Sequence, residues 1–476
     1  MSTCREAVVA TTLATTLAAT LTLGACSTPD RTSTPSGPTD TRSTLTLPPG
    51  RGAPVPTQAG TEPSSSALPE VPADVVGELQ RLLDARATAV LDHDRGRFVA
   101  GLAPRPGLVT TERRYFDNLV ELPLSVLSYR LEPASLLRTG SAYWGVVEVS
   151  LQLTPYDARP TRTLDRFRFD PAGGGSYRVG STTDRAWEAE HAGLQQPWDT
   201  EPVTVREGAG VLGVFDSADE RESRGVVRST QRGIADVSAR VPFTEWGSQA
   251  VVYALSDPRF LDGFDDLPGG DPEALDGLAF TVPAGDDATA STRFALSPSL
   301  LRRAGARRPD ADLDRLVRHE LVHVAVGQHD DGAPLWLSEG IAEWVSWQAA
   351  SPQDRRVPAE ALAAVRRGVR TMPGDGSFND DDATTHYALS WWVCEWLVQT
   401  YGPDAPWTVL EAFERRAGDD PRRVVRDLLK ISVDQLARRG AALMRTTYAA
   451  SATPRPSAGA TATPGATGSA GATPAG

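Results

Sequence analysis

Three polar residues inside an apolar run limit how this chain can fold more than any other part of its sequence. His319, Glu320 and His323 stand within the segment Leu316–Val326, whose other residues are mostly valine and leucine. Asp310 offers a helix start, and the apolar spacing that follows predicts a buried helix. Buried imidazoles are costly without a partner, so the fold has to supply one.

The spacing of these residues indicates what that partner is. His319 and His323 are four residues apart, so on a helix their side chains project from one face, one turn apart. Two imidazoles placed in this way can bind one Zn²⁺ ion from the same side. Glu320 is rotated by about 100° from His319, which puts it beside the metal, where it can take a proton from bound water. The motif therefore predicts a zinc site in which Glu320 is the general base.

A second motif follows the two histidines. Residues 336–343 read Trp-Leu-Ser-Glu-Gly-Ile-Ala-Glu. With the histidine helix, this segment resembles the gluzincin zinc metallopeptidases, in particular the peptidase-MA-like group, in which a Trp-Leu-x-Glu-Gly-x-Ala-Glu stretch opens a second helix. The resemblance implies that Glu339 is the third metal ligand and that Glu343, one turn on, orients a histidine. It covers about Val205 to Arg445.

A catalytic zinc ion needs three protein ligands and one open coordination position. Two residues besides Glu339 are candidates for the third ligand. Glu343 follows His323 after nineteen residues (324 to 342), the thermolysin-type spacing, whereas Glu339 follows after fifteen (324 to 338). His329 nearly completes the metzincin pattern His-Glu-x-x-His-x-x-Gly-x-x-His. Val326 stands where that pattern has glycine, and valine is unfavourable at a turn with positive φ. The resemblance to the peptidase-MA-like group favours Glu339.

A later helix carries a candidate oxyanion donor. In the resembling families a tyrosine-bearing helix packs beside the metal site, and residues 385–392 begin such a helix here. The resemblance implies that Tyr387, or else His386, donates a hydrogen bond to the oxyanion that develops in the transition state. A core tyrosine without a catalytic role is the alternative interpretation. The Gly-x-Met-Glu-Asn motif of the related aminopeptidases is absent, which favours endopeptidase action on a peptide or protein substrate.

The N-terminal residues predict export and lipid attachment. Arg5 precedes an apolar, threonine-rich run from Val8 to Leu23. A charged start, a modest apolar core and small residues before the cut indicate a signal peptide over residues 1–25. Leu23-Gly24-Ala25-Cys26 resembles a bacterial lipobox, which implies acylation of Cys26 and anchoring to the outer face of the cell membrane. The alternative is an ordinary secretory signal with an incidental cysteine.

Composition and periodicity divide the rest of the chain. Residues 26–70 and 450–476 are dominated by Ser, Thr, Pro, Gly and Ala, so we expect a disordered tether and a low-complexity tail. Helical spacing followed by alternating strands predicts an α+β accessory domain over 71–195, similar to nuclear-transport-factor-like domains. Short strands and then helices from Asp310 onward predict an α+β peptidase-MA-like domain over 201–449. The runs predicted as strands are 124–131, 143–153, 163–169, 176–182, 211–215, 250–255, 279–282 and 293–296.

Charge and composition exclude one class of partner. The formal net charge is −13, which argues against a nucleic-acid-binding protein. The 40% apolar and 23% charged content is typical of globular domains. We expect a monomer that binds one zinc ion and contacts the membrane through its lipid anchor. The competing hypothesis is a catalytically inactive envelope lipoprotein that acts as a binding or structural module.

Overall fold

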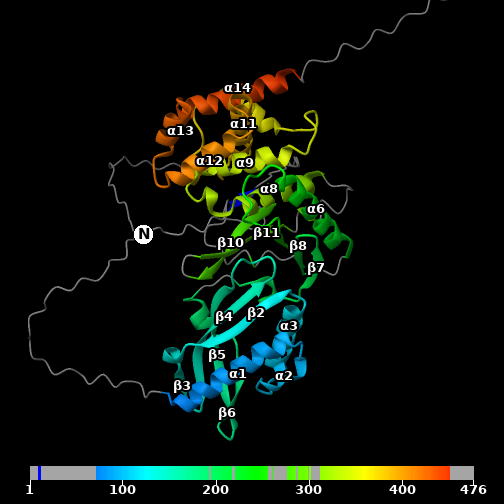
Figure 1. Ribbon diagram of the computed structural model, residues 1–476, viewed down its shortest axis with the longest axis vertical. Coiled ribbons are helices and arrows are strands. Elements are labelled where there is room, and N and C mark those ends of the chain that lie inside the picture. The colour runs from blue at the N-terminus through cyan, green and yellow to red at the C-terminus, as the bar shows by residue number, and fades with distance from the viewer. Residues whose placement is uncertain are drawn as a thin grey trace, which may run out of the picture. The chain divides into compact units, whose positions relative to one another are not determined.

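The computed structural model describes residues 9–11, 71–191, 195–216, 220–255, 260, 276–285, 288–297, 300–301 and 311–450 (Figure 1). Most of the predicted signal peptide, Cys26, the predicted tether and residues 451–476 lie outside these ranges. The described residues from Ala73 onward belong to one compact unit. It is a mixed α and β structure with a curled antiparallel sheet and a second, six-stranded sheet. Among the described residues, every helix is too short or too polar to span a lipid bilayer.

The region predicted as an accessory domain begins with helices and continues as the curled antiparallel sheet. The sheet has the order β2-β4-β5-β6, with β3 on β4, and α1 packs on β2 through its apolar face. Gly173, Gly174 and Gly175 all have positive φ in the turn between β5 and β6, a conformation that glycine adopts without steric cost. The predicted helix and strands are therefore confirmed, and the similarity to nuclear-transport-factor-like domains stays a prediction. The elements are α1 (Ala73–Leu91), α2 (Arg95–Ala100), α3 (Pro106–Val120), β2 (Leu124–Leu131), η1 (Pro133–Ser135), β3 (Leu137–Thr139), β4 (Ala142–Leu153), β5 (Thr161–Gly173), β6 (Ser176–Ser181), α4 (Arg185–Glu188) and α5 (Pro197–Thr200).

The second sheet has the order β1-β10-β11-β9-β8-β7. Strands β8, β9 and β11 run parallel, and the pairs β7–β8, β10–β11 and β1–β10 are antiparallel. Every residue of β8 and β9 is buried, as in strands covered on both faces. The bounds are β1 (Val9–Thr11), β7 (Thr204–Gly208), β8 (Val211–Phe215), β9 (Ala250–Ala254), β10 (Gly277–Gly285) and β11 (Ala288–Leu296).

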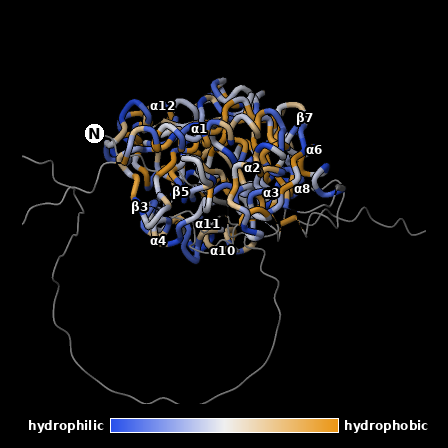
Figure 2. The backbone as a smooth tube through the Cα atoms, turned by 90° about the horizontal axis from the view of Figure 1, so that it is seen from below, coloured by the Kyte–Doolittle hydropathy of each residue, from blue (hydrophilic) through white to orange (hydrophobic). Residues whose placement is uncertain are grey.

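Helices make up the rest of the unit. Helix α8 packs against β10, α6 and α9, and α9 packs against α11 (Figure 1). A Cβ atom at Gly340 would lie 2.7 Å from the carbonyl oxygen of Ser390, so glycine lets α9 and α11 approach closely. Hydrophobic stretches gather inside the unit and hydrophilic ones along its outline (Figure 2). The elements are α6 (Glu220–Ser238), α8 (Ala311–Val326), η4 (Gly327–Asp330), α9 (Leu335–Trp347), α10 (Ala359–Arg367), η5 (Asp375–Ser377), α11 (Ala383–Tyr401), α12 (Ala405–Arg415), α13 (Pro421–Leu429) and α14 (Val433–Ala450).

Candidate metal centre

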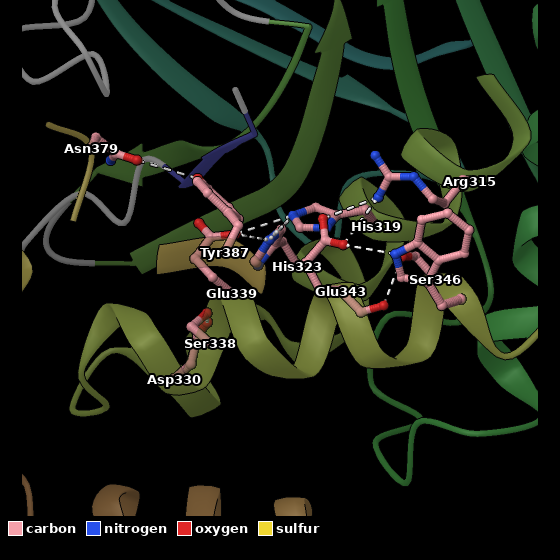
Figure 3. A network of polar contacts seen from close by, with 11 residues as sticks. Arg315, His319, His323, Asp330, Ser338, Glu339, Glu343, Ser346, Asn379 and Tyr387 are labelled. Carbon is pink, nitrogen blue, oxygen red and sulfur yellow. Dashed lines mark hydrogen bonds and ion pairs between the residues drawn. The ribbon is translucent and has the colours of Figure 1, made fainter. Parts of the chain in front are cut away.

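Three buried side chains from α8 and α9 converge at one point (Figure 3). The Nε2 atom of His319 lies 3.2 Å from Nε2 of His323 and 3.1 Å from Oε2 of Glu339. The third side of the triangle, from His323 Nε2 to Glu339 Oε2, is 3.7 Å. Nitrogen and oxygen ligands at about 2.0–2.1 Å from a tetrahedral zinc ion would be separated by about 3.4 Å. The triangle therefore has the dimensions of a three-ligand metal site.

The chemistry of the three groups also fits a cation. Two imidazole nitrogens that face each other cannot hydrogen bond unless one carries a proton, and here both also face a carboxylate. His319 and Glu339 are almost completely shielded from solvent, and buried charges need a compensating partner. One divalent ion would satisfy all three atoms together. Among the described residues, this group could hold a metal ion.

The pKa values of His319 and Glu339 are shifted by their contacts with each other and with neighbouring groups. Burial acts to lower the pKa of His319, but hydrogen bonds with Glu339 and Glu343 outweigh it and raise the pKa to about 10. Burial acts to raise the pKa of Glu339, but its contacts with His319 and His323 leave that pKa below the usual value. The two carboxylates therefore favour the protonated form of His319 in the absence of a metal ion. Metal binding would displace that proton, since histidine ligates as neutral imidazole.

Glu343 lies behind His319 and outside the metal triangle. Its Oε1 atom is 3.1 Å from Nδ1 of His319. Arg315 donates from Nη1 to both oxygens of Glu343, at 3.0 and 3.2 Å, and the indole N–H of Trp347 donates to Oε2 at 3.1 Å. Burial acts to raise the pKa of Glu343, but Arg315 and His319 lower it to about 2. An ionised carboxylate at this distance from Nδ1 favours a proton on that atom, which would leave Nε2 free to bind a metal ion.

Glu320 is fully buried on α8 and lies under strand β10. A Cβ atom at Gly277, the first residue of β10, would lie 2.6 Å from Oε1 of Glu320. Glycine therefore leaves the space that the carboxylate occupies. Glu320 does not belong to the metal-binding triangle, and its role as the general base stays a prediction.

Tyr387 lies next to the triangle. Its ring centroid is 6.4 Å from that of His319, and its hydroxyl donates to Oδ1 of Asn379 at 3.3 Å. Burial, followed by the charge of Glu339, raises the pKa of Tyr387 well above its usual value. The side chain is therefore a neutral hydroxyl that can donate a hydrogen bond. Its runner-up, His386, instead has Nδ1 at 2.9 Å from the carbonyl oxygen of Phe378.

The structure does not bring His329 into the site. Its Nδ1 atom is 2.9 Å from Oε1 of Glu414, and its ring stacks on Phe243 with centroids 3.9 Å apart. Helix α8 ends at Val326, and Gly327 adopts φ of 55° at the start of η4. The chain therefore turns one residue later than the metzincin pattern requires. Of the three candidates for third ligand, only Glu339 joins the two histidines in the described metal-binding group.

Sequence reasoning missed four residues of this site: Arg315, Trp347, Asn379 and Gly277. Arg315 precedes His319 by one helical turn. An arginine within a helix that is predicted to be buried indicates a carboxylate partner, so this residue had a signal in the sequence. The other three had no local signal. No protein-family model matches the sequence, and no curated protein matches it. The function has to be inferred from the geometry of the site itself.

Proposed function

We propose that this protein is a zinc-dependent peptidase of the gluzincin type. The observation that carries the proposal is the buried triangle of His319, His323 and Glu339, with Glu320 buried next to His319 on the same helix. A set of two imidazoles and one carboxylate suits zinc, and it leaves a fourth coordination position for water. An intact general base next to intact ligands favours an active enzyme over the competing binding or structural module.

Each residue of the site has a separate role in the proposed hydrolysis. When bound, zinc acts as a Lewis acid and lowers the pKa of its water toward neutrality. The Glu320 carboxylate accepts a proton from the attacking water and then delivers it to the leaving amine. The Tyr387 hydroxyl donates a hydrogen bond to the oxyanion of the tetrahedral intermediate. Glu343, held by Arg315, keeps the His319 imidazole in the ligating tautomer.

The way in which strand β10 pairs with an extended segment favours a polypeptide as the substrate. The extended backbone of Val9–Thr11 lies antiparallel along β10, with Thr11 opposite Gly277. Gly277 contacts Glu320, so the added strand passes next to the proposed base. An exposed strand edge that accepts an extended chain recognises peptides through their main-chain hydrogen bonds. This arrangement supports cleavage within a chain, as an endopeptidase.

Metal content measured together with proteolysis tests the proposal. We expect one zinc ion per purified chain, hydrolysis of an unstructured protein substrate, and loss of hydrolysis on chelation that added zinc reverses. Full zinc occupancy without turnover of unstructured proteins would instead support the inactive envelope lipoprotein.

Tyr387→Phe should lower kcat while the chain keeps its zinc. Phenylalanine fills the same buried space but cannot donate to the oxyanion, and loss of one such donor lowers kcat by about 10²–10³-fold. KM should change little, because the hydrogen bond forms in the transition state. Steady-state kinetics with metal analysis measures this, and His386→Ala is the matched comparison. A larger loss of kcat in His386→Ala than in Tyr387→Phe would move the donor role to His386.

Cys26→Ser should release the protein from the membrane or leave its precursor unprocessed. We propose that acyl chains on Cys26 anchor the mature protein to the outer face of the cell membrane. Fractionation of cells that express each form measures the partition between membrane and soluble fractions. Membrane association that is unchanged in the serine variant would rule out the lipid anchor.

A further inference from the structure

A buried ion pair joins the accessory domain to the second sheet. Arg293 on β11 has no solvent exposure, and its Nη2 donates to Oδ1 of Asp157 at 2.8 Å. Asp157 belongs to the loop between β4 and β5 of the accessory domain. The remaining donors of Arg293 contact Tyr253 Oη at 2.7 Å, Gln196 Oε1 at 3.1 Å and Ser291 Oγ at 3.1 Å. Among the described residues, Asp157 is the carboxylate that pairs with Arg293, and a fully buried guanidinium depends on such a partner.

Further contacts tie the same loop and strand β5 to the β10–β11 hairpin. The backbone N–H of Ala158 donates to the carbonyl oxygen of Ala290 at 2.9 Å. A Cβ atom at Gly285, the last residue of β10, would lie 3.3 Å from Cδ of Arg162 on β5. Asp157 also accepts from the hydroxyl of Ser291 at 2.6 Å. The accessory domain therefore contacts both strands of the β10–β11 hairpin.

The same hairpin covers the proposed general base. Arg293 pairs with Phe280 across the hairpin, and Phe280 is three residues from Gly277, which contacts Glu320. Side chains alternate between the two faces of a strand, so positions 277 and 280 point to opposite faces. Three residues of strand span about 10 Å. The ion pair of Arg293 and Asp157 therefore lies on one side of the hairpin, and Glu320 lies on the other side. The two contacts are separated by only about three residues along β10.

We infer that residues 71–191 are a positioning domain, which holds the β10–β11 hairpin over Glu320 through the Asp157–Arg293 pair. In this role the domain fixes the position of the β10–β11 hairpin next to the metal centre, and it does not move independently of that hairpin. Without Asp157, Arg293 would carry an uncompensated charge in the interior. It would have to move toward water, and the hairpin to which it belongs would move with it. The structural part of the inference stands alone, and its kinetic part rests on the proposed peptidase activity.

Hydrogen exchange of the mature full chain tests the structural part. In Asp157→Ala we expect backbone amides of residues 277–285 to exchange at least about tenfold faster than in the wild type, because the pair no longer restrains the hairpin. Arg293→Met in the Asp157→Ala background should recover part of the protection, since it removes the unpaired charge. Arg130→Ala is the matched control, because the Arg130–Glu148 pair is an exposed ion pair within the accessory domain.

The kinetic arm compares the same variants on an unstructured protein. We expect Asp157→Ala to lower kcat/KM at unchanged zinc content, and Arg130→Ala to leave kcat/KM and exchange unchanged. Wild-type exchange of residues 277–285 in Asp157→Ala would overturn the inference. If Asp157→Ala does not fold, Asp157→Asn takes its place in both assays. A wild-type chain that hydrolyses nothing would refute the peptidase proposal, while the exchange result would still decide the role of the domain.

Discussion

Glu320→Gln is expected to remove nearly all hydrolysis while the chain keeps its stoichiometric zinc. Glutamine has the size of glutamate and fits the space that Gly277 leaves above it. It cannot accept a proton from water, and loss of a general base lowers the rate by about 10²–10⁴-fold. The metal should stay, because Glu320 lies outside the triangle formed by His319, His323 and Glu339. Metal analysis and single-turnover proteolysis on the same preparation measure both quantities.

The outcome separates two roles that a carboxylate can have at a metal site. Glu339→Gln is the matched control, since it makes the same chemical change at a proposed ligand and should reduce zinc content. If Glu320→Gln lost its zinc with an unchanged circular dichroism spectrum, Glu320 would be a ligand and not the base. If it kept both zinc and full activity, another group would activate the water.

The parts of the fold that sequence predicted are those whose signals are local. Strand β4 alternates buried and half-buried residues along its length, and α8 repeats its apolar residues at helical spacing, so each element could be predicted alone. His319 and His323 share one helix, so their convergence follows from helical geometry. Strand β7 was missed because its five residues lack a buried alternation. Helix α3 was missed although Pro106 at its first turn is a local start signal.

The rest of the site depends on how elements pack together. Glu339 and Glu343 are one turn apart on α9, so only the rotation of α9 against α8 decides which of them reaches the metal position. Gly277 belongs to a strand more than forty residues before Glu320, and nothing in its neighbourhood indicates the contact. The pair of Arg315 and Glu343 likewise joins two helices. These contacts are tertiary, and local periodicity carries no information about them.

Removal of the third ligand should empty the site. Glu339→Ala leaves two protein ligands, which is too few for a stable catalytic zinc site, so we expect the purified chain to lose stoichiometric zinc and all activity. Glu343→Gln keeps the shape of the side chain behind His319 but weakens its hold on Nδ1. A change at such an outer carboxylate typically lowers metal affinity or activity by about 10–100-fold. Competition with a chromogenic chelator measures the affinity of each variant.

His329→Ala completes the comparison as the variant that should change nothing at the metal. His329 contacts Glu414 and Phe243 near the surface, so its removal should leave zinc affinity and kcat within about twofold of the wild type, as for surface substitutions away from special features. The three variants rank the candidates by zinc affinity, from Glu339→Ala as the weakest to His329→Ala as the strongest. The reverse result, an empty site in His329→Ala and a loaded one in Glu339→Ala, would require a metzincin-type arrangement. Helix α8 would then have to end differently, so that the chain after Val326 returned to the metal.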